Sequence, residues 1–199
     1  VNAGGYSRLR LLNGCAKAWG GSGAVIGFDS IADGVCASGN GEYGVRMSSG
    51  IVTHCIAVGN ADSGFLSVRT KCVACEASLN SNVGFWSSNG SSLNGCAAIQ
   101  NGVGFIVEQD SVATGCIAMD SVSQGVILRL RARALECESY GGGDGFIVSD
   151  AACDRCHAVG SSSLGMYCGE AQRALITRCM ASRNGTNFAF NSGNSFGPV

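Results

Sequence analysis

A two-residue signal recurs along the whole chain at a spacing of about twenty residues. In each copy a glycine precedes an apolar side chain, often phenylalanine. The copies are Gly5-Tyr6, Gly27-Phe28, Gly44-Val45, Gly64-Phe65, Gly84-Phe85, Gly104-Phe105, Gly125-Val126, Gly145-Phe146 and Gly165-Met166, with Asn187-Phe188 as a degenerate tenth. A fixed period of this length indicates a repeat architecture, in which each unit packs against its neighbours in the sequence.

A series of cysteines runs in step with this signal, about ten residues later. Its members are Cys15, Cys36, Cys55, Cys75, Cys96, Cys116, Cys137, Cys156 and Cys179. Most of the 12 cysteines therefore keep the period of the repeat. We interpret them as an inward row of small apolar side chains rather than a disulfide framework, with thiols that are mostly free. On this interpretation the cysteines do not indicate whether the protein resides in an oxidising or a reducing compartment.

Each repeat unit has the alternation of short β-strands rather than the spacing of a helix. Phe105 and Val107 alternate with Ile106 and Glu108, and a polar break at Asp110 follows. The second stretch of this unit has three expected inward residues, which are Val112, Cys116 and Ala118. Glycine, serine and asparagine at this density disfavour helices. Because a unit of two or three strands cannot bury its apolar face alone, we expect identical units to stack.

The predicted fold is all-β: a right-handed parallel β-helix (β-solenoid) of about ten short coils of ~20 residues, with residues 1–199 as a single domain. The two ends both look like ordinary coils. Three alternatives follow for them: the chain is part of a longer protein or is capped by partners, copies stack head-to-tail, or the caps escape recognition.

Composition narrows the class of partner. The chain has 199 residues with 31 glycines, one proline and only 14% charged residues. A net charge of −1 without a basic block argues against nucleic acid as a partner. No apolar run approaches the ~20 residues of a membrane-spanning helix, so we expect no membrane insertion.

Two polar features of the repeat suggest turns. The glycine before each inward apolar residue is expected to mark a corner with positive φ. An asparagine follows several of the ladder cysteines by four or five positions, and we interpret these side chains as a stacked ladder at a turn. They are Asn40, Asn60, Asn80, Asn101 and Asn184.

The segments Asn80 to Phe85 and Cys75 to Asn80 resemble bacterial and phage members of the right-handed parallel β-helix proteins, the pectate-lyase-like superfamily. The resemblance covers essentially the whole chain and implies the fold. It leaves the activity open among polysaccharide lyases, glycoside hydrolases, alginate epimerases, phage tailspikes and adhesins. Left-handed hexapeptide helices and pentapeptide-repeat helices rank lower, because the chain has no strict sub-period of five or six residues.

The residue after each inward apolar side chain should point outward. After Asp29 and Arg46, this outward row is apolar for six consecutive coils: Leu66, Trp86, Ile106, Ile127, Ile147 and Tyr167. Such a stripe suggests a subunit interface along the rod, as in trimeric tailspikes. The alternatives are a covering loop or domain, and a carbohydrate groove around Trp86 and Tyr167.

Charge is concentrated in the later coils, where Glu108 and Asp110 should stack beside Arg129 and Arg131, with Asp150 following. The favoured interpretation is structural cross-strand pairing. The alternative is a catalytic groove, with paired carboxylates for hydrolysis or a base and an arginine for a lyase or epimerase. The resemblance implies catalytic motifs that this chain lacks: Asn-Thr-Asp, Gly-His-Gly, adjacent Asp-Asp and Asp-Pro-His.

The segment Cys153 to His157 matches the haem-attachment pattern C-x-x-C-H. Cys156 already belongs to the inward row, and Cys72 precedes Cys75 at the same spacing. We therefore assign Cys72 and Cys153 to a second small inward position and expect no metal and no cofactor.

These observations favour a non-catalytic structural or surface-recognition β-solenoid scaffold, extracellular or at a cell or particle surface. It would self-associate as a trimer or a head-to-tail filament, through the outward row or the open ends. The alternative is a carbohydrate-active enzyme that acts on an acidic polysaccharide, as a lyase, hydrolase or uronate epimerase.

Overall fold

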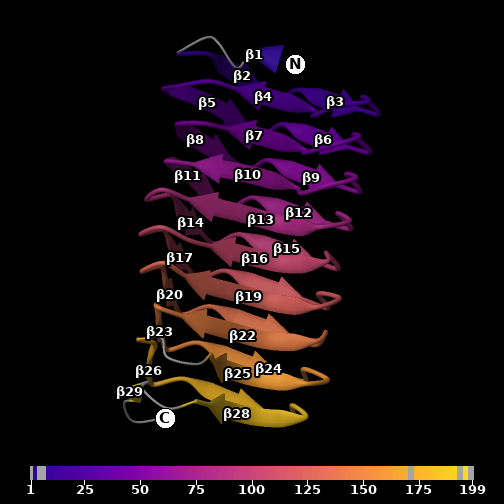
Figure 1. Cartoon of the computed structure of the whole chain (residues 1–199). Coiled ribbons are helices and arrows are strands. Elements are labelled where there is room, and N and C mark those ends of the chain that lie inside the picture. Colours follow the sequence, from indigo (N-terminus) through magenta and orange to yellow (C-terminus); the bar gives the residue numbers. More distant parts are fainter. Residues whose placement is uncertain (1, 4–7, 170–172, 192–194, 197–199) are drawn as a thin grey trace.

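The computed structural model describes residues 2–3, 8–169, 173–191 and 195–196. All regular structure among them is β-strand, wound into about nine stacked turns. Figure 1 shows the turns piled along one axis, with the two ends of the chain at opposite ends of the pile. The predicted right-handed parallel β-helix is confirmed, with about nine turns where ten were expected.

The strands form three parallel sheets. Sheet A contains β1 (Asn2–Ala3), β4 (Ala24–Ile26), β7 (Val45–Met47), β10 (Phe65–Val68), β13 (Val83–Ser88), β16 (Val103–Val107), β19 (Gln124–Arg129), β22 (Asp144–Ser149), β25 (Leu164–Cys168) and β28 (Thr186–Phe190). Sheet B contains β2 (Arg10–Leu12), β5 (Ser30–Asp33), β8 (Gly50–Thr53), β11 (Thr70–Val73), β14 (Ser92–Asn94), β17 (Val112–Thr114), β20 (Arg133–Leu135), β23 (Ala152–Asp154), β26 (Leu175–Thr177) and β29 (Ser195–Phe196). Sheet C contains β3 (Cys15–Lys17), β6 (Cys36–Ser38), β9 (Ile56–Val58), β12 (Glu76–Ser78), β15 (Ala97–Ile99), β18 (Ile117–Met119), β21 (Glu138–Tyr140), β24 (His157–Val159) and β27 (Met180–Ser182).

Like residues stack on like residues inside the helix. The rings of Phe65 and Phe85 lie 4.7 Å apart between centroids with planes 4° apart, and Phe85 and Phe105 lie 5.1 Å apart at 9°. All three rings are fully buried. Because parallel strands in register repeat every ~4.8 Å, a flat ring on one coil fits directly on the ring of the next.

The glycines before these inward residues have a different role from the one expected. Gly64 does not have a positive φ; a Cβ added to it would lie 2.8 Å from the Cβ of Ala77 and 2.9 Å from the Asn80 amide nitrogen. The glycine is needed for space, since sheet A meets sheet C there without room for a side chain. The left-handed residues lie at other turns, including His54 and Ala74 just before the cysteine row.

The repeat starts differently from the prediction. Gly27-Phe28 is not a copy of the signal, because β4 pairs Ala24 with Val45 and leaves Phe28 half exposed in a turn. The Gly23 amide donates to the Tyr43 carbonyl, so Gly23 is the glycine of the repeated signal in that coil. Gly5-Tyr6 lies outside the described residues.

The cysteine row is also shorter than predicted. The seven members from Cys55 to Cys179 are buried, but Cys15 is exposed and Cys36 is half-buried. Cys15 pairs with Cys36 in sheet C, and Cys36 pairs with Ile56. Both cysteines therefore lie one residue past the inward position, which Val35 occupies in the coil of Cys36. All 12 cysteines are free thiols in this structure.

In sheet B, one residue predicted to point inward is wrong by one position. Val112 is half-buried, whereas its neighbour Ala113 is almost completely buried and fills the inward position in sheet B. Cys116, Ala118, Phe105 and Val107 point inward as predicted.

The asparagine ladder is confirmed for Asn40, Asn60, Asn80 and Asn101, whereas the half-buried Asn184 stands apart from it and accepts from the Ser161 amide. Asn80 donates an amide hydrogen to Asn101 Oδ1 at 2.9 Å and to the Ala57 carbonyl at 3.0 Å, and its own Oδ1 accepts from the Asn60 amide. These side chains are buried, so the ladder satisfies backbone groups at the bend between sheets C and A. Serine replaces asparagine at Ser121 and Ser161, and neither hydroxyl has a hydrogen-bond partner among the described residues.

Candidate functional site

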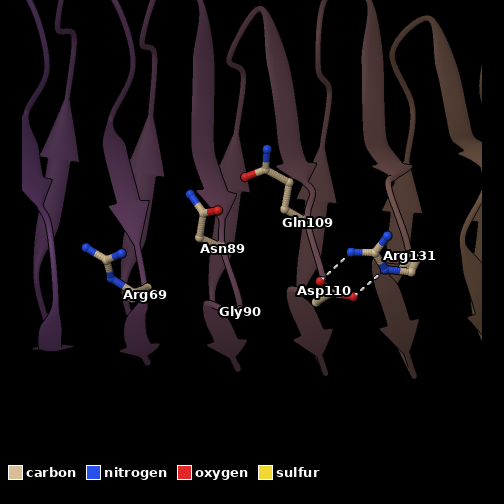
Figure 2. A pocket seen from close by; sticks show the side chains of 6 residues that line it. All are labelled: Arg69, Asn89, Gly90, Gln109, Asp110 and Arg131. Atoms are coloured by element: carbon tan, nitrogen blue, oxygen red, sulfur yellow. Dashed lines mark hydrogen bonds and ion pairs between the residues drawn. The ribbon is translucent and has the colours of Figure 1, made fainter.

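The bend that follows sheet A carries a run of polar side chains on successive turns. Six residues line a groove of about 560 Å³ here, which we call the corner groove: Arg69, Asn89, Gly90, Gln109, Asp110 and Arg131. Figure 2 shows them along the edge of the stacked strands. Arg69, Asn89, Gln109, Asp110 and Arg131 all have φ between 50° and 65°. This left-handed conformation turns the chain sharply from sheet A into sheet B.

Asp110 and Arg131 form a two-pronged ion pair across adjacent coils. The Arg131 Nε donates to Asp110 Oδ1 at 2.8 Å, and a terminal guanidinium nitrogen donates to Oδ2 at 2.8 Å (Figure 2). Hydrogen bonding to Arg131, with a smaller contribution from its charge, lowers the pKa of the Asp110 carboxyl and raises that of Arg131. Asp110 is therefore a carboxylate with little tendency to take up a proton.

Arg69 has a different partner. Its guanidinium carbon lies 5.9 Å from the centroid of the Phe28 ring, within range of a cation–π contact. Arg69 is exposed and forms no ion pair with any described residue. Its charge is therefore available to an incoming anion.

A smaller hollow of about 270 Å³ adjoins the corner groove and shares Arg131 with it. Its walls also carry Asp150, Arg133 and Arg173. Within the described part of the chain, neither Arg133 nor Arg173 is in an ion pair. The two hollows together present four arginines against two aspartates, so this edge of the rod favours an anionic ligand.

Glu108 and Arg129 lie elsewhere, on the outward face of sheet A. They form an ion pair, and Glu108 also accepts a hydrogen bond from Trp86 Nε1 at 3.4 Å. The Glu108 side chain is only 13% exposed. The pairing of Glu108 with Arg129 and of Asp110 with Arg131 is as the sequence suggested, but only Asp110, Arg131 and Asp150 face the two hollows.

The sequence-based prediction included only Asp110 and Arg131 of the six residues that line the corner groove. It did not select Arg69, Asn89 and Gln109, or Arg133 and Arg173 in the second hollow. A signal exists, because Arg69, Asn89 and Gln109 occur at intervals of twenty residues. The same twenty-residue spacing that marks the asparagine ladder therefore also marks these polar residues.

The outward apolar row is in register over six coils. Strand pairing joins Leu66 to Trp86, then Ile106, Ile127, Ile147 and Tyr167 in that order. Ile106 is buried at 8% exposure and the other five are half-buried, because neighbours in the row cover one another. Asp29 does not begin this row as predicted; Val25 pairs with Arg46 at that position.

One group of side chains could hold a metal ion among the described residues. It consists of the thiols of Cys153, Cys156 and Cys179, all buried. The sequence predicted Cys156 and Cys179 on successive coils of one inward row and Cys153 in a second inward position, but not that the three thiols meet. Strand pairing stacks the Cys179 coil directly on theirs.

The geometry defines the chain as a parallel β-helix, and comparison with solved structures agrees. The chain is similar to the crystal structure of pectate lyase Pel9A, with a TM-score of 0.55 and 15% sequence identity. The match covers 83% of this chain and 60% of the lyase, so the chain spans less than two thirds of that protein. At this identity the likeness shows the fold alone. No protein-family model and none of the curated proteins match the sequence.

No helix among the described residues has the length and apolar character needed to cross a membrane.

Proposed function

We propose that the chain is a non-catalytic surface-recognition scaffold whose corner groove binds an acidic polysaccharide. The main support is a row of exposed arginine and amide side chains on successive turns. The row runs from Arg69 through Asn89 and Gln109 to Arg131. Guanidinium groups bind carboxylates by charge and by paired hydrogen bonds. A rigid rod with one such group every few coils suits a long, repetitive anion.

Binding is favoured over catalysis by the state of the carboxylates. A glycoside hydrolase needs one protonated acid and one free carboxylate. Asp110 has a lowered pKa and both oxygens engaged by Arg131, while Glu108 is bound to Arg129 and Trp86 on another face. Glu108 and Asp110 therefore do not form an acid and base pair.

The fold neighbour supports the choice of ligand class. The similar solved structure is named a pectate lyase, which acts on an acidic polysaccharide. Transfer of a uronate polymer to this chain is part of our proposal, because the structural likeness itself extends only to the fold. An extracellular or surface location follows from such a ligand and belongs to the same proposal.

Calorimetric titration with oligogalacturonate tests the proposal, with its methyl-esterified form as the uncharged probe. We expect binding of the charged form only, and no shortening of the oligomer on prolonged incubation. Arg69→Gln and Arg131→Gln should each weaken binding at least about tenfold, because each removes charged hydrogen bonds. Lys17→Gln, an exposed cation in sheet C, is the control and should bind normally.

The other outcomes separate the alternatives. Shortened oligomers would show that the chain is a carbohydrate-active enzyme and would overturn the non-catalytic proposal. Equal binding of the esterified form, or full affinity in both arginine variants, would remove the corner groove as an anion site.

A second proposal concerns self-association, supported by the unbroken register of the outward row. We infer that sheet A packs against a second copy of the chain along this row, as in a side-by-side trimer; head-to-tail stacking of the ends remains the other mode. Ile127→Asp should lower the light-scattering mass of the particle after size exclusion. Ile56→Asp, at a residue 42% exposed on sheet C, is the matched control. An unchanged mass for Ile127→Asp would reject this face.

A further inference from the structure

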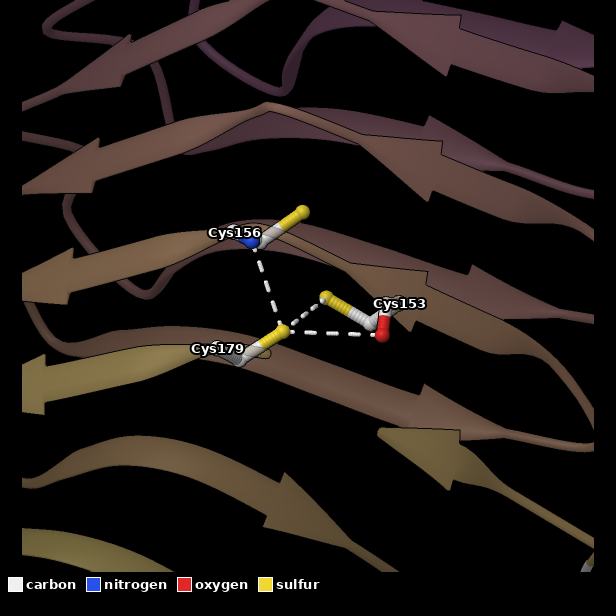
Figure 3. A group of neighbouring side chains, drawn as sticks. All are labelled: Cys153, Cys156 and Cys179. Atoms are coloured by element: carbon white, nitrogen blue, oxygen red, sulfur yellow. Dashed lines mark hydrogen bonds between the residues drawn. The ribbon is translucent and has the colours of Figure 1, made fainter. Parts of the chain in front are cut away.

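The three-thiol cluster lies in the core near the C-terminal end of the rod. Cys153 lies in β23 of sheet B, while Cys156 and Cys179 occupy the bend before sheet C in successive coils. Their Sγ atoms all lie within 4.8 Å of one another, and those of Cys153 and Cys179 are 3.7 Å apart. The residues are 0%, 0% and 3% exposed. Figure 3 shows the thiols of Cys153 and Cys179 turned toward each other, with Cys156 beside them on the neighbouring coil.

The chain contains a matched set of cysteines that does not converge. Cys72, Cys75 and Cys96 hold the same places in an earlier pair of coils, yet only the later group brings three ligand atoms together among the described residues. The Cys72 Sγ lies 3.2 Å from the Ser67 Oγ, so a hydroxyl on sheet A engages it.

The hydroxyl is missing in the later coil. Strand pairing carries the Ser67 position through Ser87, Val107 and Leu128 to Val148. Val148 offers no hydrogen bond to Cys153, whose thiol lies against Cys179 instead. The convergence of three sulfurs is therefore specific to this coil rather than a general result of the cysteine row.

The spacing suits a metal bound by sulfur. A metal at ~2.3 Å from each of three sulfurs in a plane places those sulfurs about 4.0 Å apart. The observed separations need only small side-chain rotations to reach this. Thiolates are soft ligands that select ions such as Cu(I) and Zn²⁺ over hard cations.

We propose that Cys153, Cys156 and Cys179 form a binding site for one thiophilic d¹⁰ metal ion, coordinated by three thiolates. Each thiol loses its proton to solvent as its sulfur–metal bond forms, so a divalent ion releases three protons and leaves a net charge of −1. No fourth ligand residue joins the group among the described residues, which favours trigonal coordination. The site is independent of the corner groove.

Cd²⁺ is the probe, and the two outward cysteines must first be removed. Cys15 and Cys36 pair in sheet C with exposed or half-buried thiols, and together they would bind metal themselves. The background protein is therefore the Cys15→Ser/Cys36→Ser variant, fully reduced and incubated overnight with Cd²⁺. We expect one Cd²⁺ per folded chain by native mass spectrometry, together with thiolate-to-metal charge-transfer absorbance.

In this background Cys179→Ser and Cys153→Ala should each abolish the absorbance. Cys96→Ser, an equally buried cysteine of the same row, should retain it. Circular dichroism of each variant confirms that the fold is kept, and Cys153→Ala provides a second test if Cys179→Ser unfolds. Ser67→Ala should free Cys72 and raise the stoichiometry toward two. The proposal is overturned if the folded background takes up no Cd²⁺, or if uptake is unchanged in folded Cys153→Ala.

Discussion

Gly84 faces Ala98 of the same turn so closely that a Cβ on the glycine would lie 2.9 Å from the alanine Cβ. The carbonyl oxygen of Gly104 would be closer still, at 2.6 Å. The glycine of the repeat thus allows sheets A and C to meet, and the small residue opposite it is part of the same fit.

Gly84→Ala should destabilise the chain by about 2–3 kcal/mol, because overpacking here pushes against backbone. Urea unfolding followed by circular dichroism measures the change. Gly20→Ala is the control, since a Cβ at Gly20 meets nothing within 4 Å. Equal midpoints for the two variants would contradict the close fit.

Asn80→Ala should cost about 3 kcal/mol or more, because the backbone and side-chain amides of Asn60 lose a shared buried acceptor and the Ala57 carbonyl loses a donor. Asn82→Ala provides the comparison, as Asn82 is exposed and its amide bonds only to Asp62. Thermal unfolding of the two variants should separate them clearly, and a small effect at Asn80 would argue against an energetic role for the ladder.

Ser139→Ala should stabilise the chain by about 1 kcal/mol, because it removes a buried hydroxyl that has no hydrogen-bond partner among the residues the structure describes. Ala118 and Ala158 hold the same position in the adjacent coils, so alanine fits there. Ser91→Ala should have the opposite sign, since the Ser91 hydroxyl donates to carbonyl oxygens and accepts from the Thr70 amide. Denaturant midpoints decide between these signs; a loss of stability in Ser139→Ala would mean that the hydroxyl has a partner.

The Asp110 carboxyl should titrate below its ordinary value of 3.8, because Arg131 bonds to the ionised form. With a depressed folded pKa, the stabilising pair is present above the unfolded value and is lost as the pH falls through the folded pKa. Carboxyl NMR titration should show the Asp110 midpoint rising in Arg131→Gln. Asp154, whose pKa is lowered chiefly by its bond to Arg178, should stay low in the same sample. A shared shift of both residues would point to a general change in structure.

Thiol labelling of the native protein should follow burial. Cys15 is exposed, Cys36 is half-buried and the other ten cysteines are buried. A colorimetric thiol reagent should therefore modify Cys15 rapidly, Cys36 slowly, and the remainder only in denaturant. Rapid native labelling of more than two thiols would contradict the inward row.

The sequence alone predicted the fold because the period is visible in inward residues such as Phe65, Phe85 and Phe105. It misplaced the first coils because Gly27-Phe28 imitates the signal four residues late, and because Cys15 and Cys36 stand one residue past the inward position. A repeated dipeptide does not show which residues pair between neighbouring coils, whereas the backbone hydrogen bonds do.

The candidate site was harder to predict. The direction of Arg69 and Gln109 depends on left-handed backbone at a bend, which the alternation of apolar residues does not encode. Cys153 lies against Cys179, whereas Cys72 lies against Ser67, and the position of Ser67 is held in the later coil by Val148, a residue of another sheet. Both facts require coordinates in three dimensions.

The strict coil-on-coil register also bears on how such a chain changes in length. Each coil presents to the next the same edge that it received from the one before, so duplication or loss of one whole unit leaves every remaining contact type intact. The number of residues in a coil is less strict: Ala134 pairs with Cys153 after 19 residues and Cys153 with Ile176 after 23, so extra residues at a bend leave the stacking of the following coils in register. The length of the rod along its axis therefore changes in whole steps of ~4.8 Å, one step for each coil gained or lost.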